Sequence, residues 1–285
     1  MKYQRRHKTN WPLVIGGTVA ILSTMAGLGY AAFQAYGKPV PDRYGCFDGV
    51  SGKQTHVLID ASEPRFDTDQ QRALFRYFKQ EYDRLGFGDR ISVYTTEGDQ
   101  QASVLSPRFH ICVPAREPDQ LTAIGADAGS SGYVRKQRER LYEKQFLPEL
   151  QAVLADDPAD MRRQNTQSPI LEMVADLSRM QSVRPGDKVT MISDLIQNSP
   201  ESAQFCRVQN DMPPFVLFAQ RRIYQGRLKP RSLEGVSVDM LMLLRRAYGP
   251  FCRDEDEIRR FWIDYFHANG VKVPRVIRIR YGLRG

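Results

Sequence analysis

Oxygen-bearing side chains follow a short apolar run near the start of the chain. Val57, Leu58 and Ile59 form a run typical of a strand that is buried on both faces, and Asp60 and Ser62 come directly after it. In open α/β sheets, ligands bind just beyond the carboxyl ends of the strands, where the strand order reverses. Carboxylate and hydroxyl oxygens are ligands of hard cations. An Asp-x-Ser sequence at this place therefore predicts a site for a hard cation.

A second carboxylate ends a later apolar run. Residues 188–195 have the pattern of another buried strand, which contains Ser193 and Asp194 near its end. Because the carboxyl ends of parallel strands meet at one edge of a sheet, we expect Asp60 and Asp194 to lie at the same edge. Between them, Ser168 and Pro169 precede an amphipathic stripe, which predicts a helix with Ser168 as its N-cap and Pro169 at its first position.

The elements that must position these residues alternate between strands and helices. A capping box at Asp67 and Gln70 predicts a helix that ends at Gly86. Further helices are expected over residues 133–155, with a kink near Pro148, and after Ser168 and Asp254. Further strands are expected over residues 90–96 and 108–113 as a hairpin, and over residues 188–195, 236–244 and 273–281, the last at a sheet edge. This order predicts an α/β fold with a mainly parallel, doubly wound sheet and helices on both faces.

The N-terminal stretch has the pattern of a membrane anchor. Residues 1–10 carry four basic residues and no acid, and residues 11–37 carry no charge. About 20 apolar residues span a bilayer as a helix. We therefore expect a cytoplasmic basic head at 1–10, one transmembrane helix at 11–36, a stalk at 37–54 and an extracytoplasmic domain at 55–285. A cleaved signal peptide is the alternative, although its apolar region would be unusually long.

The predicted location is the bacterial inner membrane, with a single pass, the N-terminus in the cytoplasm and the C-terminal domain in the periplasm. An even number of cysteines in such an oxidising compartment predicts two disulfides. Sequence proximity and the expected sheet favour the pairs Cys46–Cys112 and Cys206–Cys252. The chain has no Cys-x-x-Cys pair and its four histidines are scattered in the sequence, so we expect no zinc site.

The net charge of +8 is not evidence for a nucleic-acid partner. The chain has 41 basic and 33 acidic residues, and its first ten residues supply four of the basic ones and no acid. A basic segment beside a membrane span is explained by topology and by anionic lipid. We therefore expect no binding to nucleic acid.

Taken together, these motifs resemble a von Willebrand factor type A domain over nearly all of residues 55–281. Three pieces carry the resemblance: the strand that ends at Asp60-Ala-Ser62, the Ser168-Pro169 helix entry and the strand that ends at Ser193-Asp194. In that family a metal-ion-dependent adhesion site is built from an Asp-x-Ser-x-Ser loop, a Thr in a second loop and an Asp in a third. Its ion is usually magnesium, and a carboxylate from a partner protein often completes the shell.

The resemblance implies four ligands for Mg²⁺ or Mn²⁺, namely Asp60, Ser62, Ser168 and Asp194. Two positions depart from the family's pattern: Pro64 replaces the second serine of the loop, and Ser168 stands at the threonine position. Glu63 is an alternative oxygen donor for the ligand lost at Pro64, and Thr166 is a second candidate for the threonine position. The expected site is therefore a degenerate one.

The resemblance implies binding rather than catalysis. We expect a protein-interaction module that contacts an acidic group of another envelope protein at the carboxyl ends of the strands, as a subunit of an envelope complex. A stripe of small residues within 11–36 also allows two copies to pack as a homo-oligomer. The alternatives are a metal-dependent hydrolase that uses Asp60 and Asp194, and a degenerate scaffold without metal. Because the sequence has no Gly-x-Ser-x-Gly or His-Glu-x-x-His motif, we expect the protein not to be an enzyme.

Overall fold

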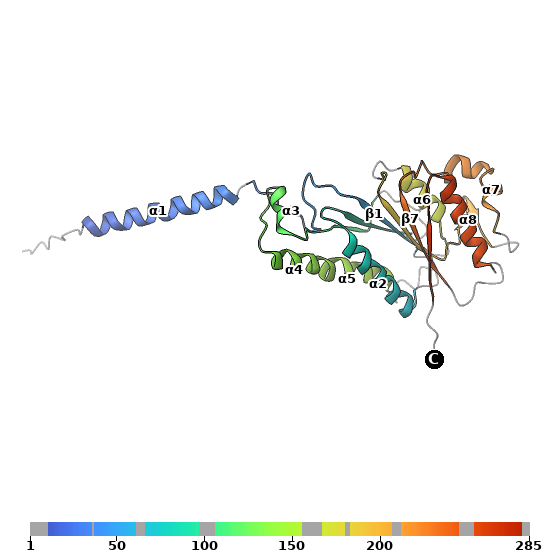
Figure 1. The fold of residues 1–285 in the computed structure, drawn as a ribbon, viewed down its shortest axis with the longest axis horizontal. Coiled ribbons are helices and arrows are strands. Elements are labelled where there is room, and N and C mark those ends of the chain that lie inside the picture. The colour runs from blue at the N-terminus through green and yellow to red at the C-terminus, as the bar shows by residue number, and fades with distance from the viewer. Residues whose placement is uncertain are drawn as a thin grey trace, which may run out of the picture.

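The computed structural model describes residues 11–35, 37–60, 66–96, 106–155, 167–179, 183–206, 212–244 and 254–280. A six-stranded sheet with the order β3-β2-β1-β4-β7-β8 forms its centre (Figure 1). Its strands are β1 (Gln54–Ile59), β2 (Arg90–Thr95), β3 (Phe109–Cys112), β4 (Lys188–Ser193), β7 (Ser237–Leu243) and β8 (Arg275–Ile279). β2 and β3 pair antiparallel, and the other neighbouring strands pair parallel. The predicted mainly parallel sheet, the hairpin and the edge position of β8 are confirmed.

The strand order reverses in the middle of the sheet. The chain starts at β1, moves outward through β2 to β3, then returns to β4 on the other side of β1 and continues to β7 and β8. Ile59 at the end of β1 lies opposite Ile192 of β4. The carboxyl ends of β1 and β4 therefore flank the crevice at which open α/β sheets bind their ligands.

Helices cover both faces of the sheet, as predicted. Side chains alternate along each strand, so neighbouring residues of one strand enter different cores. Leu58 and Met191 pack with α6 (Ile170–Arg179), α7 (Phe215–Phe218), α8 (Glu255–Ala268) and a π-helical turn at Tyr224–Leu228. Val57 and Ile192 pack with α2 (Thr68–Arg84), α4 (Ser131–Leu141) and α5 (Leu147–Leu154). The described elements also include the short helix α3 (Pro118–Ala123) and the two-residue strands β5 (Asn198–Ser199) and β6 (Ala203–Gln204).

The kink expected near Pro148 is a single π-helical turn. α4 ends at Leu141, the π turn covers Tyr142–Phe146, and α5 begins at Leu147. Proline has no N–H to donate, and its ring would clash with the carbonyl of Lys144 in a regular α-helix. A wider turn before the proline relieves this clash while the apolar stripe stays on the sheet.

The N-terminal helix α1 spans Trp11–Ala35, and Figure 1 shows it projecting away from the α/β domain. The side chains of residues 16–30 are exposed. In the described part of the chain, no helix is both long and apolar enough to cross a membrane.

The first predicted disulfide is confirmed, because Cys46 is bonded to Cys112. This bond joins the segment before β1 to the last residue of β3. Cys206 is also disulfide-bonded. Cys252 lies outside the described residues, so the pairing Cys206–Cys252 stays a prediction.

Candidate functional site

Asp60 follows β1 directly and contacts side chains from two other segments. Its Oδ2 accepts a hydrogen bond from the Ser168 hydroxyl at 2.7 Å and one from the Ser193 hydroxyl at 2.8 Å. Its backbone N–H donates to the Ile192 carbonyl at 2.9 Å, which extends the pairing of β1 with β4 by one residue. Asp60, Ser168 and Ser193 are 3%, 4% and 1% exposed. Three segments that are distant in sequence thus meet where the strand order reverses.

The backbone that follows β4 is held in a strained turn. Leu195 has a φ of 65°, in the left-handed region that costs a non-glycine residue about 1–2 kcal/mol. The Ser193 hydroxyl accepts the Leu195 N–H at 2.8 Å, and Asp194 Oδ1 accepts the Ile196 N–H at 3.0 Å. The indole N–H of Trp262 donates to the Leu195 carbonyl at 2.8 Å. Backbone strain that is held in place by several hydrogen bonds is a recurrent feature of functional sites.

Ser168 is not the N-cap of the next helix, so that prediction was wrong. α6 begins at Ile170, and the Ser168 hydroxyl donates to Asp60. The cap comes from elsewhere, because the Leu171 N–H donates to Gln197 Oε1 at 2.8 Å. The physical reason is that a buried carboxylate needs hydrogen-bond donors, while the amide of Gln197 satisfies the helix end.

Gln197 is itself held by α6. Its Nε2 donates to Glu172 Oε2 at 2.8 Å, and the Ser202 hydroxyl donates to the other oxygen of Glu172. Gln197 is fully buried, and Glu172 is 3% exposed. The backbones of Ser168 and Asn198 also exchange two hydrogen bonds, at 2.8 and 2.9 Å. Glu172 therefore ties the segment that carries Ser168 to the loop that follows β4.

The oxygen atoms around Asp60 fit a hard cation such as magnesium. A serine hydroxyl has one hydrogen and two lone pairs. Ser168 gives its hydrogen to Asp60 and keeps its lone pairs, whereas Ser193 also accepts the Leu195 N–H. Carboxylates and hydroxyls are the donor types that Mg²⁺ takes, and Mg²⁺ keeps several waters, so few protein ligands suffice. Asp60 and Ser168 are therefore the better placed of the predicted ligands.

The structure brings together part of the predicted ligand set. Asp60 and Ser168 are in direct contact, while the hydrogen bond described for Asp194 goes to Ile196 in its own turn. Ser62, Glu63 and Thr166 lie outside the described residues, so their roles stay predictions. The contact of Ser193 with Asp60 was not predicted from the sequence. The parallel register of β1 and β4 indicates this contact, because it places Asp60, which follows Ile59, beside Ser193, which follows Ile192.

A second polar cluster lies in the amino-terminal half of the sheet and was also not predicted. Asp239 of β7 accepts hydrogen bonds from Arg275 at 2.6 Å and from Tyr77 at 2.7 Å, and it forms an ion pair with Lys188 at 2.7 Å. Lys188 also contacts Glu81 of α2 at 2.5 Å. Burial alone would raise the pKa of Asp239, but hydrogen bonds from Arg275, Lys188 and Tyr77 outweigh it and lower this pKa to about 2. These charges are paired with one another, which indicates a structural role.

Comparison with known proteins gives little beyond this geometry. No protein-family model matches the chain, and no curated protein matches it. One similar solved structure is the conserved hypothetical protein BatB from Bacteroides thetaiotaomicron, which is 12% identical, with 81% of this chain and 92% of that chain covered and a TM-score of 0.34. Another is an aerotolerance-related membrane protein from Bacteroides fragilis NCTC 9343 with multiple mutations to serines, which is 10% identical, with the same coverage and a TM-score of 0.33. TM-scores this low do not establish a shared function.

Proposed function

We propose that this chain is a membrane-anchored binding module whose domain, similar to von Willebrand factor type A domains, contacts a partner protein at the carboxyl ends of β1 and β4. The observation that carries the proposal is the meeting of Asp60, Ser168 and Ser193 where the strand order reverses. Open α/β sheets place their ligand sites at this point. The strained Leu195 beside the cluster supports the same assignment.

The module would bind its partner through Mg²⁺ or Mn²⁺. Asp60, Ser168 and Asp194 would supply oxygen ligands, with Ser62 as a further candidate. An ion that has few carboxylate ligands from its own protein keeps exchangeable water positions. An acidic group of another envelope protein can replace one of these waters, which is the recognition chemistry that we propose. Catalysis is not part of the proposal.

The proposed location is the bacterial inner membrane, with the domain on the periplasmic side. Residues 11–37 carry no charge and follow a basic segment at residues 1–10, which is the sequence pattern of a single-pass anchor. The Cys46–Cys112 disulfide supports an oxidising compartment for the domain. Carbonate extraction of cell membranes tests the anchor: the full chain should stay in the membrane pellet, and its release into the supernatant would contradict the proposal.

A metal-free scaffold is the second candidate, and one observation favours it. Both serine hydroxyls donate to the same oxygen of Asp60, and the three residues are almost fully buried. Such a cluster satisfies its own polar groups without an ion. In this case Asp60 would tie β1 to β4 and to the start of α6, and the partner would contact another surface.

Manganese binding by the full chain in detergent separates the two candidates. Wild type and Asp176→Asn should bind one Mn²⁺ per chain, and Asp60→Asn should lose this binding while it keeps the size of the side chain. Asp176 is a matched control because it is a carboxylate on α6 with a side chain that is 44% exposed and paired with Arg179. Saturable binding that Asp60→Asn removes supports the metal site. If wild type binds no Mn²⁺ at millimolar concentration, the scaffold is favoured.

Site-specific photo-crosslinking in cells tests the partner surface. A photoreactive side chain at Ile196, beside the cluster, should give a crosslink to another envelope protein. The same side chain at Asp83, an exposed position at the far end of α2, serves as the positional control. The Ile196 crosslink should weaken in the Asp60→Asn background and persist in the Asp176→Asn background. A crosslink of unchanged intensity in the Asp60→Asn background would show that partner binding does not depend on this cluster.

A further inference from the structure

The segment before β1 lies against β3 and is fixed there by its backbone. The Asp42 N–H donates to the Cys46 carbonyl at 2.8 Å, and the Cys112 N–H donates to the Tyr44 carbonyl at 2.9 Å. Gly45 has a φ of +80°, and a Cβ at this position would lie 2.8 Å from the Cys112 carbonyl oxygen. The turn at residues 42–46 is therefore closely packed on β3 by contacts other than the disulfide.

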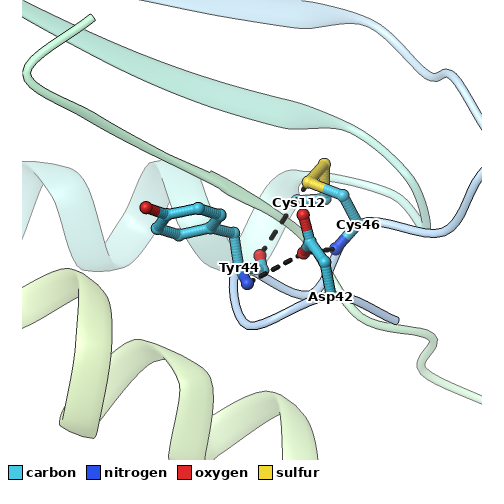
Figure 2. Close-up of a disulfide and its surroundings, with 4 residues drawn as sticks. All are labelled: Asp42, Tyr44, Cys46 and Cys112. Atoms are coloured by element: carbon cyan, nitrogen blue, oxygen red, sulfur yellow. Dashed lines mark hydrogen bonds between the residues drawn. A yellow bond between two sulfur atoms is a disulfide. The ribbon is translucent and has the colours of Figure 1, made fainter. Parts of the chain in front are cut away.

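Metal-ligating side chains gather on this turn and on β3. The ligand atoms of Asp42, Cys46 and His110 all lie within 4.8 Å of one another. His110 and Cys112 are two residues apart on β3, so their side chains leave the strand on the same face. Figure 2 shows the carboxylate of Asp42 beside the Cys46–Cys112 disulfide. Cys112 joins these three residues through its bond to Cys46, so two cysteines, one histidine and one aspartate are neighbours here.

We propose that reduction of the Cys46–Cys112 disulfide creates a zinc site with Cys46, Cys112, His110 and Asp42 as its four ligands. The reductant is a dithiol: its two sulfurs become a disulfide, and its two hydrogens and two electrons convert the protein disulfide into two thiols. Zn²⁺ then replaces the two thiol protons, which are released to solvent. Two thiolates, an imidazole and a carboxylate provide the tetrahedral shell of sulfur, nitrogen and oxygen ligands that zinc takes in proteins.

The geometry suits one ion between the two chain segments. The Cα atoms of Cys46 and Cys112 are 4.9 Å apart, so both sulfurs can reach one ion with Zn–S bonds of about 2.3 Å. Asp42 Oδ1 accepts the N–H groups of Tyr44 and Cys46 at 2.8 and 2.9 Å, which orients the carboxylate and leaves Oδ2 outside these two bonds (Figure 2). The ring of Tyr44 packs on the ring of His110 at 4.6 Å between centroids. Two of the four ligands are thus oriented before an ion binds.

The charge around the site also favours the loaded state. Two thiolates, a carboxylate and Zn²⁺ leave one net negative charge. Arg43 stacks over the Tyr44 ring at 4.6 Å, and Arg90 of β2 is paired with Cys112 of β3. Neighbouring cations stabilise thiolates, so they favour the form that binds the metal. In the reduced chain, zinc would hold the segment before β1 on β3 in the way that the disulfide does in the oxidised chain.

Cobalt binding by the full chain in detergent tests the proposal, because Co²⁺ bound to thiolates has a charge-transfer absorption band. The disulfide is reduced with a water-soluble phosphine, which becomes its oxide with oxygen from water. Reduced wild type should bind one Co²⁺ per chain with this band, and Zn²⁺ should displace it. Oxidised wild type should show no band. His110→Ala should weaken binding at least about tenfold, since it removes a direct ligand.

The control variant is His267→Ala, an exposed histidine of α8 whose ring contacts the Val271 carbonyl. It should bind Co²⁺ like wild type. Reduction also frees the thiol of Cys206, so binding that His110→Ala leaves unchanged would belong to other thiols and would overturn the proposal. Absence of the band in reduced wild type would overturn it too, as would a band accompanied by loss of the folded circular dichroism spectrum.

Discussion

A buried histidine in the central strand should make the stability of the protein depend on pH. His56 of β1 is fully buried, and neither of its ring nitrogens has a hydrogen-bond partner among the described residues. Its ring lies 6.1 Å from the ring of Tyr94. Burial lowers the pKa of His56 from its usual 6.5 to about 4; the charge of Asp187 raises it and that of Arg90 lowers it further. The folded protein therefore resists protonation of this ring.

The size of the effect follows from the two pKa values. One pKa unit corresponds to about 1.4 kcal/mol, so the shift from 6.5 to about 4 is worth about 3 kcal/mol. Because the folded pKa is the lower one, the contribution of His56 to stability is complete above pH 6.5 and is lost as the pH falls toward 4. Between about pH 8 and pH 4.5 this residue alone should lower the free energy of unfolding by about 2–3 kcal/mol.

Replacing His56 with leucine removes the titrating group and keeps a similar volume. Two buried nitrogens without partners cost about 1–3 kcal/mol, so His56→Leu should be at least as stable as wild type at about pH 8. Urea unfolding followed by tryptophan fluorescence gives the free energy of unfolding at each pH. The difference in the free energy of unfolding between variant and wild type should grow by about 2–3 kcal/mol on acidification to about pH 4.5. His110, whose pKa is lowered by burial and by Arg90, is common to both proteins and cancels. Parallel curves for the two proteins would refute the reasoning.

Three further substitutions test the two polar clusters, each by the free energy of unfolding at about pH 7. Ser193→Ala removes one bond to the carboxylate of Asp60 and one from the Leu195 N–H, and should cost about 2–4 kcal/mol; a loss below about 0.5 kcal/mol would contradict this. Trp262→Phe leaves the buried Leu195 carbonyl without its donor and should cost about 1–3 kcal/mol. Relative to wild type, amide hydrogen exchange should become faster in the turn after β4 and change less in β8. Asp239→Asn removes the carboxylate that faces Lys188 and Arg275, and should cost about 3–5 kcal/mol; an unchanged stability would show that these charges are not coupled.

The fold was predictable from the sequence because its signals are local. Apolar runs such as residues 57–59 and 188–195 identify buried strands, and the capping box at Asp67 and Gln70 is present as predicted. Alternation of strands and helices then leaves a small number of sheet arrangements. The strand order that places Asp60 at a point of reversal is one of them.

The contacts within the site were not predictable in the same way. The acceptor for the Ser168 hydroxyl and the cap for α6 come from Asp60 and Gln197, and neither is near Ser168 in sequence. The approach of His110 to Cys46 depends on how the segment before β1 packs on β3. Side-chain partners of this kind are set by tertiary packing, which propensity and periodicity do not encode.

The two ends of the sheet differ in a way that supports the proposed site. In the amino-terminal half, Lys188 and Arg275 already neutralise Asp239, so an added cation would meet paired charges. At the carboxyl ends of the strands, the described donors to Asp60 are neutral hydroxyls. A hydroxyl can donate to a carboxylate and offer a lone pair to a cation at the same time. A divalent ion could therefore bind beside Asp60 and Ser168 while their mutual hydrogen bond persists, whereas at Asp239 it would have to displace Lys188 or Arg275.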